Sequence, residues 1–225
     1  MITNLDHLIV SVKDLSEAEK TFSKLFGMKP VWRGEHPELG TINSIFNFSN
    51  TYFEILASKG KGLGAALVEK SIEEKGEGLT GFVLGTDDIE SIKVKIQKEI
   101  IDVGKISIGE GMDFESNEVR KWKNLFLPDH LTRGLFCFLI QHTQGKLPMP
   151  SNFPETSIHK LDHLVVNTND PDGFIDIYKN KYGIRLALDQ TVQKWGGRML
   201  FFRLNKTTIE VIGKENDEDV QDSLW

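Results

Sequence analysis

Two histidine–glutamate pairs with one spacing are the residues of this sequence that point most directly to chemistry. His7 is followed 47 residues later by Glu54, and His163 is followed at the same distance by Glu210. Both glutamates lie inside apolar runs, where a carboxylate is costly unless it is paired or bound to a cation. Imidazole and carboxylate together suit zinc, iron, nickel or manganese. The plainer alternative, which stays open, is that each pair only makes hydrogen bonds.

The stretch around each histidine is repeated along the chain. Leu5-Asp6-His7-Leu8-Ile9-Val10 returns as Leu161-Asp162-His163-Leu164-Val165-Val166, an offset of 156 residues. The offset then holds without a gap, for example from Gly27 to Gly183. Self-similarity at a fixed period indicates a duplicated structural unit.

The hydrophobic pattern predicts the elements of this unit. Residues 3–12 form a predicted strand, on which His7 shares a face with Leu5 and Ile9. A helix follows, with Ser16 and Glu19 as a capping box. Three strands complete a βαβββ unit, near residues 29–33, 43–48 and 51–57.

The rest of the chain divides into similar units. We expect a glyoxalase-like domain over residues 1–143, made of units 1–58 and 79–143, and a proline-containing linker over 144–158. A third βαβββ unit over 159–214 repeats the first, and an acidic tail covers 215–225. A fourth unit has no room after the third, so we expect either a longer natural protein or a third unit whose inward face is covered by other structure. That cover is a second chain, with a homodimer preferred, or a contact within this chain.

The motifs of the first unit resemble a known family. Leu5-Asp6-His7, Gly34-Glu35-His36-Pro37 with Gly40-Thr41 and Asn43, and Tyr52-Phe53-Glu54-Ile55 look like the glyoxalase-like domain branch of the vicinal oxygen chelate superfamily. That superfamily includes glyoxalase I, bleomycin-resistance proteins and extradiol dioxygenases. The resemblance covers nearly the whole chain. It implies an α+β fold in which repeated βαβββ units form a cup-shaped mixed sheet.

The resemblance also implies a divalent metal ion (zinc, nickel, manganese or iron) at the base of the cup. Its ligands come from the first and last strands of each unit, so the first unit supplies His7 and Glu54. The second unit departs from the pattern, because Gly81 stands where a histidine is expected and Gln141 where a glutamate is usual. The third unit again has His163 and Glu210. The candidate metal ligands are therefore His7, Glu54, Gln141, His163 and Glu210.

Four further residues are candidate substrate contacts. His36 precedes a proline in the loop leading to the cup, where an exposed loop histidine is the alternative. Asn43 either meets substrate or fixes that loop through side-chain hydrogen bonds. Arg120 and Trp122 share a strand face, so an anionic or flat ligand fits between them; packing at the sheet edge is the alternative.

Two functions follow from the resemblance. In the first, a metal-dependent enzyme of lyase, isomerase or dioxygenase type acts on a small molecule with vicinal oxygens, with Glu54 as the catalytic residue. In the second, a metal-free protein of the bleomycin-resistance type binds or sequesters a small ligand. The glycine at position 81 favours the second function, and the retained histidine–glutamate pairs favour the first, which we prefer.

The composition indicates which kind of partner and which cellular compartment to expect. The net charge is −6, which argues against nucleic acid. The single cysteine, Cys137, lies in an apolar run and fits an inert thiol in a reducing compartment. No apolar run reaches the length of about 20 residues that spans a membrane. We therefore expect a cytoplasmic protein that binds a small molecule.

Overall fold

The computed structural model describes residues 1–98, 103–150, 153–192, 194, 197–214 and 222–224. Most of the expected acidic tail, at 215–221 and 225, lies outside the described residues. The first unit consists of β1 (Ile2–Val12), α1 (Leu15–Phe26), β2 (Trp32–His36), β3 (Thr41–Asn47) and β4 (Tyr52–Ser58).

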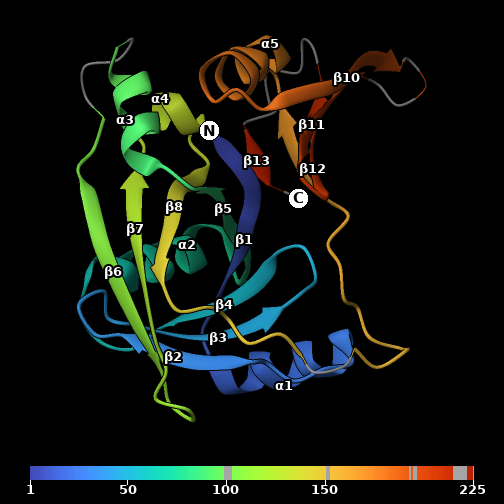
Figure 1. The fold of residues 1–225 in the computed structure, drawn as a ribbon. Helices are drawn as coiled ribbons and strands as arrows, with labels where there is room; N and C mark the ends of the chain where they lie inside the picture. Colours follow the sequence, from blue (N-terminus) through green and yellow to red (C-terminus); the bar gives the residue numbers. More distant parts are fainter. Residues whose placement is uncertain (99–102, 151–152, 193, 195–196, 215–221, 225) are drawn as a thin grey trace.

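The second unit follows a connecting helix, α2 (Leu63–Lys75). Its elements are β5 (Gly78–Thr86), α3 (Ile89–Gln97), β6 (Ile106–Asp113), β7 (Val119–Phe126), α4 (Asp129–Thr132) and β8 (Phe136–Gln144). The eight strands of the two units close into a barrel in the order β1-β4-β3-β2-β6-β7-β8-β5 (Figure 1). The α+β fold expected from the sequence is confirmed, and its cup is a closed barrel.

The third unit forms a separate sheet beside the barrel (Figure 1). It contains β9 (His163–Thr168), α5 (Pro171–Phe174), a π-helix (η1, Ile175–Lys181), β10 (Arg185–Val192), β11 (Gly197–Leu204), β12 (Thr207–Gly213) and β13 (Ser223–Leu224). Its strand order is β10-β11-β12-β9-β13. None of the helices in the described ranges is long and apolar enough to cross a membrane.

The first and third units share their strand register. In the first unit β1 and β4 are parallel, with His7 opposite Tyr52. In the third unit β9 and β12 are parallel, with His163 opposite Thr208, at the same offset of 156 residues. In both units the helical segment is followed by a glycine with positive φ, Gly27 after α1 and Gly183 just after η1, because a left-handed residue stops a helix with least strain when it has no Cβ.

Two differences from the expected elements concern the first unit. The N-cap of α1 is Asp14, whose carboxylate accepts from the Glu17 backbone N–H at 2.9 Å, so the predicted capping box of Ser16 and Glu19 is wrong. Glu19 instead accepts hydrogen bonds from Arg33 and Ser44. The loop expected around His36 is largely strand, because β2 runs to that residue.

One face of the third unit packs on the outside of the barrel. Leu164 and Val211 from its sheet join Leu84 and Leu139 of the barrel in one hydrophobic cluster, together with the aromatic residues of α5 and η1. A second cluster lies between α1 and the strands of the first unit. The inside of the barrel is left to line a cavity.

Candidate functional site

A cavity of about 480 Å³ occupies the interior of the barrel. Its polar lining includes His7 of β1, Asn43 of β3, Glu54 of β4 and Arg120 of β7. Strand alternation explains this set, since inward residues recur at every second position, as with Tyr52, Glu54 and Leu56 on β4. The volume lies within the range of small-molecule sites, about 300–1,000 Å³.

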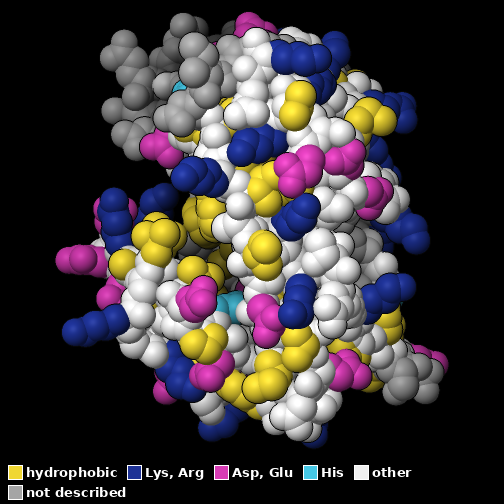
Figure 2. All heavy atoms as spheres, turned by 60° about the vertical axis from the view of Figure 1, so that its left-hand side comes forward, with side chains coloured by type: hydrophobic (Ala, Val, Ile, Leu, Met, Phe, Trp, Pro, Cys, Tyr) yellow, Lys and Arg dark blue, Asp and Glu magenta, His cyan; other side chains and the backbone are white. Residues whose placement is uncertain are grey.

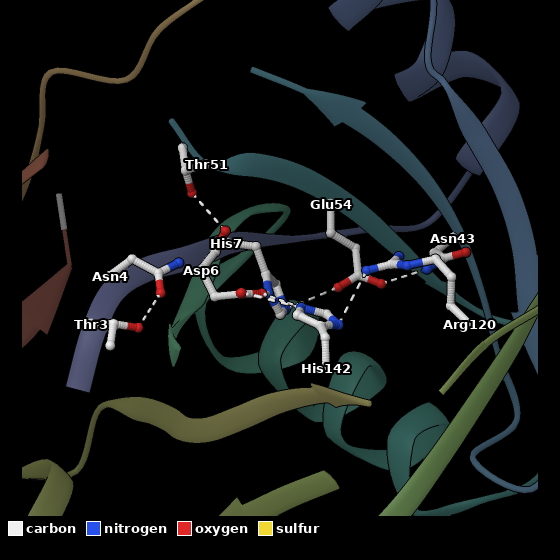
Figure 3. A network of polar contacts seen from close by, with 9 residues as sticks. All are labelled: Thr3, Asn4, Asp6, His7, Asn43, Thr51, Glu54, Arg120 and His142. Carbon is white, nitrogen blue, oxygen red and sulfur yellow. Dashed lines mark hydrogen bonds and ion pairs between the residues drawn. The ribbon is translucent and has the colours of Figure 1, made fainter. Parts of the chain in front are cut away.

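Three residues form a line of polar contacts at the base of this cavity (Figure 3). The Nδ1 atom of His7 lies 2.8 Å from a carboxylate oxygen of Asp6, and its Nε2 atom lies 3.4 Å from Glu54 Oε2. The imidazole ring stacks on Tyr52 with 4.4 Å between ring centroids. His7 is therefore held on one side by a carboxylate and faces a second carboxylate on the other.

Asp6 reaches the site although it is the immediate neighbour of His7. The β1–β5 register shifts between Leu5 and His7, so that two steps on β1 match one step on β5. Such an irregularity breaks the alternation of side chains and re-aims one of them. Burial alone would raise the pKa of Asp6, but the hydrogen bonds from His142 and His7 hold it well below its usual value. Asp6 is therefore ionised at neutral pH.

The charge on Asp6 fixes the donors around it. An ionised carboxylate only accepts hydrogen bonds, so Nδ1–H of His7 and Nε2–H of His142 donate to it, the latter at 3.2 Å. His142 Nδ1 then accepts from the Arg120 guanidinium at 3.5 Å. On the other side of the site, Asn43 donates its amide N–H to Glu54 Oε1 at 2.6 Å. The chain of contacts thus joins five strands of the barrel.

Arg120 lies inside a group of aromatic rings. Its guanidinium carbon is 5.4 Å from the ring centroid of Trp32, 5.6 Å from that of Tyr52 and 6.0 Å from that of Trp122. Cations at such distances are attracted to ring faces. The Arg120 residue is only 5% exposed.

His36 borders the same cavity from the end of β2. Its Nδ1 atom lies 3.0 Å from the Thr41 hydroxyl, and its ring meets Trp122 edge-on. Burial lowers the pKa of His36, and the charge of Arg120 lowers it further against the opposing effect of Glu54. All four candidate substrate residues, His36, Asn43, Arg120 and Trp122, therefore line one cavity.

The profile of the glyoxalase-like domain family matches residues 5–159, well over half of the chain. The chain belongs to the glyoxalase-like domain family. It is thereby a member of the vicinal oxygen chelate superfamily, whose members are enzymes or binding proteins. No curated protein matches the chain.

Solved structures share the fold of this glyoxalase-like chain at low sequence identity. A hypothetical protein from Staphylococcus aureus is 15% identical, with a TM-score of 0.69 over 98% of this chain and 88% of that one. A methylmalonyl-CoA epimerase from Streptomyces coelicolor, solved with 2-nitronate-propionyl-CoA, is 17% identical, with a TM-score of 0.52 over 66% of this chain and 100% of that one. These likenesses show the fold alone.

Gln141 does not join His7 and Glu54, so its expected approach to a shared metal site is wrong. Its side chain lies outside the barrel, where its amide donates to the Asp87 carbonyl and accepts from the Ile89 N–H at the start of α3. The next residue, His142, points into the cavity. The sequence did not lead us to predict His142 and Asp6 as residues of the site. Alternation along β8 through Phe138 and Ile140 could have indicated His142, and the repetition of Asp6 as Asp162 could have indicated Asp6.

The strand register shows which residues of the second unit stand at the positions equivalent to His7 and Glu54. In β1 and β4, His7 is opposite Tyr52 and Ile9 is opposite Glu54. In β5 and β8 the matching pairs are Gly81 with Phe136 and Val83 with Phe138. Gly81 and Phe138 thus stand at the positions of histidine and glutamate. A Cβ at position 81 would lie 2.4 Å from the Phe136 carbonyl oxygen, so the site also has no room for a side chain there.

The residues present do not complete the metal site that the sequence led us to expect. His7 and Glu54 supply two ligands, whereas such metals take at least three from the protein. Within the described ranges, no three His, Cys, Asp or Glu residues are grouped so that they could hold a metal ion. The two carboxylates and two imidazoles are instead linked to each other.

The third unit repeats the histidine contacts on an open surface. His163 Nδ1 lies 3.1 Å from Asp162 and its Nε2 lies 3.6 Å from Glu210. The His163 side chain is 45% exposed, compared with 4% for His7. His163 and Glu210 lie on the third-unit sheet, not in the barrel cavity.

Proposed function

We propose that this chain is an enzyme that moves a proton on a small molecule with vicinal oxygens, bound in the barrel cavity. The observation that carries the proposal is the line Asp6–His7–Glu54 at the base of that cavity. A carboxylate behind one ring nitrogen orients the imidazole and makes its other nitrogen a better base. The superfamily and its small-molecule ligands support a site of this kind.

In the proposed reaction Glu54 is the catalytic base. A C–H bond next to a carbonyl breaks, its electron pair moves onto the carbonyl oxygen to form an enolate, and the proton goes to Glu54 Oε2. The nearby Nε2 atom of His7 shares that proton, while Asn43 holds the other carboxylate oxygen. The Arg120 guanidinium offsets the negative charge that develops on the substrate. Return of the proton to a different atom or face gives the isomerase-type product.

The test measures proton exchange rather than one guessed product. Wild-type protein is incubated in D₂O with 2-oxo acids, 2-hydroxy ketones and 1,2-diketones, and loss of the C–H signal is followed by proton NMR. We expect exchange in at least one class, and a loss of about 100-fold or more in Glu54→Gln, the usual scale for a removed general base.

Glu210→Gln is the matched control, because Glu210 faces a histidine in the same way on the third unit. We expect this variant to keep the wild-type exchange rate. The proposal fails if no compound exchanges, or if Glu54→Gln exchanges as fast as wild type. A cavity that binds such compounds without exchange would instead support a metal-free binding or sequestering protein of the bleomycin-resistance type.

A metal-dependent lyase, isomerase or dioxygenase is the second candidate, favoured by one distance. Two ligands bonded at about 2.1 Å to a tetrahedral metal lie about 3.4 Å apart, which is the separation of His7 Nε2 and Glu54 Oε2. The candidate ions are zinc, nickel, manganese and iron. Metal analysis of protein purified without chelator or nickel resin tests it: near-stoichiometric metal that Glu54→Gln loses supports the candidate, and only trace metal removes it.

Two further parts of the proposal concern the molecule as a whole. We propose a homodimer. In the first unit the face that carries His7 lines the enclosed cavity, whereas the equivalent face of the third unit, which carries His163, is exposed and can be covered by a second copy of the chain. We also propose the cytoplasm as its compartment, because the buried Cys137 is a free thiol.

A further inference from the structure

The barrel cavity has a polar inner end and an apolar mouth. The mouth is bordered by four large hydrophobic side chains that are all exposed: Leu39, Leu63, Leu67 and Phe126. Figure 2 shows hydrophobic side chains gathered around a hollow, with a histidine in its floor. Exposed apolar surface that leads into a cavity indicates a ligand with an apolar part.

The inner end holds a buried cation that lacks a carboxylate partner. The carboxylates of the site are taken by other groups, since Asp6 accepts from His7 and His142 and Glu54 accepts from Asn43. No described carboxylate lies within ion-pair distance of Arg120, and its Nε atom is buried without a hydrogen-bond partner. A buried charge of this kind is costly unless something pairs with it.

Most of the other buried polar atoms without a partner in the described ranges lie in the same cavity. Of the five buried side-chain nitrogen or oxygen atoms that lack a partner in the described ranges, four line it: Ser11 Oγ, Asn43 Oδ1, Arg120 Nε and Asn124 Oδ1. Buried polar groups are normally hydrogen-bonded, so this concentration marks groups that a ligand satisfies. Lys70 and Lys75 also border the cavity, but on α2, and Lys70 is paired with Glu74.

We propose that the cavity recognises an amphiphilic monocarboxylate. Its carboxylate pairs with Arg120, and its aliphatic or aromatic body extends past Leu67 and Phe126 toward the mouth. A carboxylate is favoured over a doubly charged phosphate because the inner end offers one unpaired cation, whose planar fork matches a carboxylate. This inference rests on the proposed function only in placing the ligand beside Glu54.

The test compares four simple probes by isothermal titration calorimetry: octanoate, octan-1-ol, acetate and octyl phosphate. We expect octanoate to bind at least tenfold more tightly than octan-1-ol, which lacks the charge, and than acetate, which lacks the chain. Octyl phosphate separates the two anion chemistries. Tighter binding of octyl phosphate than of octanoate would overturn the carboxylate assignment.

Variants separate the anchor from general charge. Arg120→Met should weaken octanoate at least tenfold and leave octan-1-ol within twofold. Lys121→Met is the matched control, because Lys121 is the next residue on β7 and pairs with Glu110 instead. If Arg120→Met does not fold, Leu67→Lys at the mouth should weaken octanoate while leaving acetate unchanged. Octanoate binding that neither variant weakens overturns the proposal.

The binding experiment is independent of catalysis. Octanoate has no acidic C–H bond next to a ketone, so its binding to the wild-type protein is measured without proton transfer. If no compound exchanges its proton but octanoate still binds selectively, only the proposed function is contradicted. Proton exchange with equal binding of octanoate and octan-1-ol would remove this inference alone.

Discussion

Among single residues, Asp6 decides how the site is ordered. It is ionised, buried and shared between two imidazoles, so it fixes which nitrogen of His7 faces Glu54. Without that acceptor, the His7 ring could carry its proton on either nitrogen. Asp162 repeats the contact in the third unit, but its side chain is 86% exposed. The aspartate–histidine pair therefore contributes far less to the stability of the protein there.

We therefore expect Asp6→Asn to destabilise the protein and Asp162→Asn to leave it nearly unchanged. Asparagine keeps the shape of aspartate but turns an N–H toward a ring N–H, which leaves buried donors unpaired. The expected loss in unfolding free energy is about 2 kcal/mol for Asp6→Asn and under about 0.5 kcal/mol for Asp162→Asn. Urea unfolding measures both. Equal losses in the two variants would contradict the role given to burial.

The candidate site could be predicted in part from single residues. His7 and Glu54 are repeated at a fixed spacing, and period-two alternation puts Arg120 and Trp122 on one strand face. Only the structure shows that these residues and Asn43 line the same cavity. Asp6 was not predicted to be part of the site, because strand alternation assigns its side chain to the face opposite His7. Only the irregular β1–β5 register turns it inward. Gln141 was placed at the position of the glutamate, but the strand register puts Phe138 there, and Gln141 lies on the opposite face of β8 from Phe138 and His142.

For whole elements, the repeat is a better guide than local motifs. Ser16 and Glu19 fit a capping box, yet the cap is Asp14, whose counterpart Asp170 caps α5 by the same contact to the third residue on. The 156-residue offset pairs these two aspartates and contains no second copy of Ser16. A shorter element such as β2 was placed too early, because five residues carry little periodic signal.

The cap of α1 can be tested against the motif that suggested another residue. Asp14→Ala should lower the unfolding free energy by about 1 kcal/mol, because it leaves the Glu17 N–H without its acceptor. Ser16→Ala should change it by less than about 0.5 kcal/mol, since Ser16 is exposed and lies inside the helix. Thermal and urea unfolding report both values. A larger effect of Ser16→Ala would restore the capping box.

In the whole molecule, the barrel and the third unit share one hydrophobic core. Leu84 of β5 and Val166 of β9 are both fully buried in the same cluster. Polar contacts cross the same boundary, since Tyr182 donates to the Leu131 carbonyl and Arg133 pairs with Asp170. The duplicated sequence indicates repeated units, but it does not reveal this packing, because tertiary contacts between units leave no periodic pattern.

The shared core predicts that the barrel and the third unit unfold together. Leu84→Ala removes buried methyl groups between them and should cost about 2–5 kcal/mol. Because both parts depend on that cluster, the slowest-exchanging amides of β5 and of β12 should lose the same free energy of protection in native-state hydrogen exchange. Ile108→Ala is the control, since Ile108 is 79% exposed on β6 and should change neither set. Loss of protection in β5 with β12 unchanged would mean that the third unit folds as a separate body, and calorimetry would then resolve two transitions instead of one.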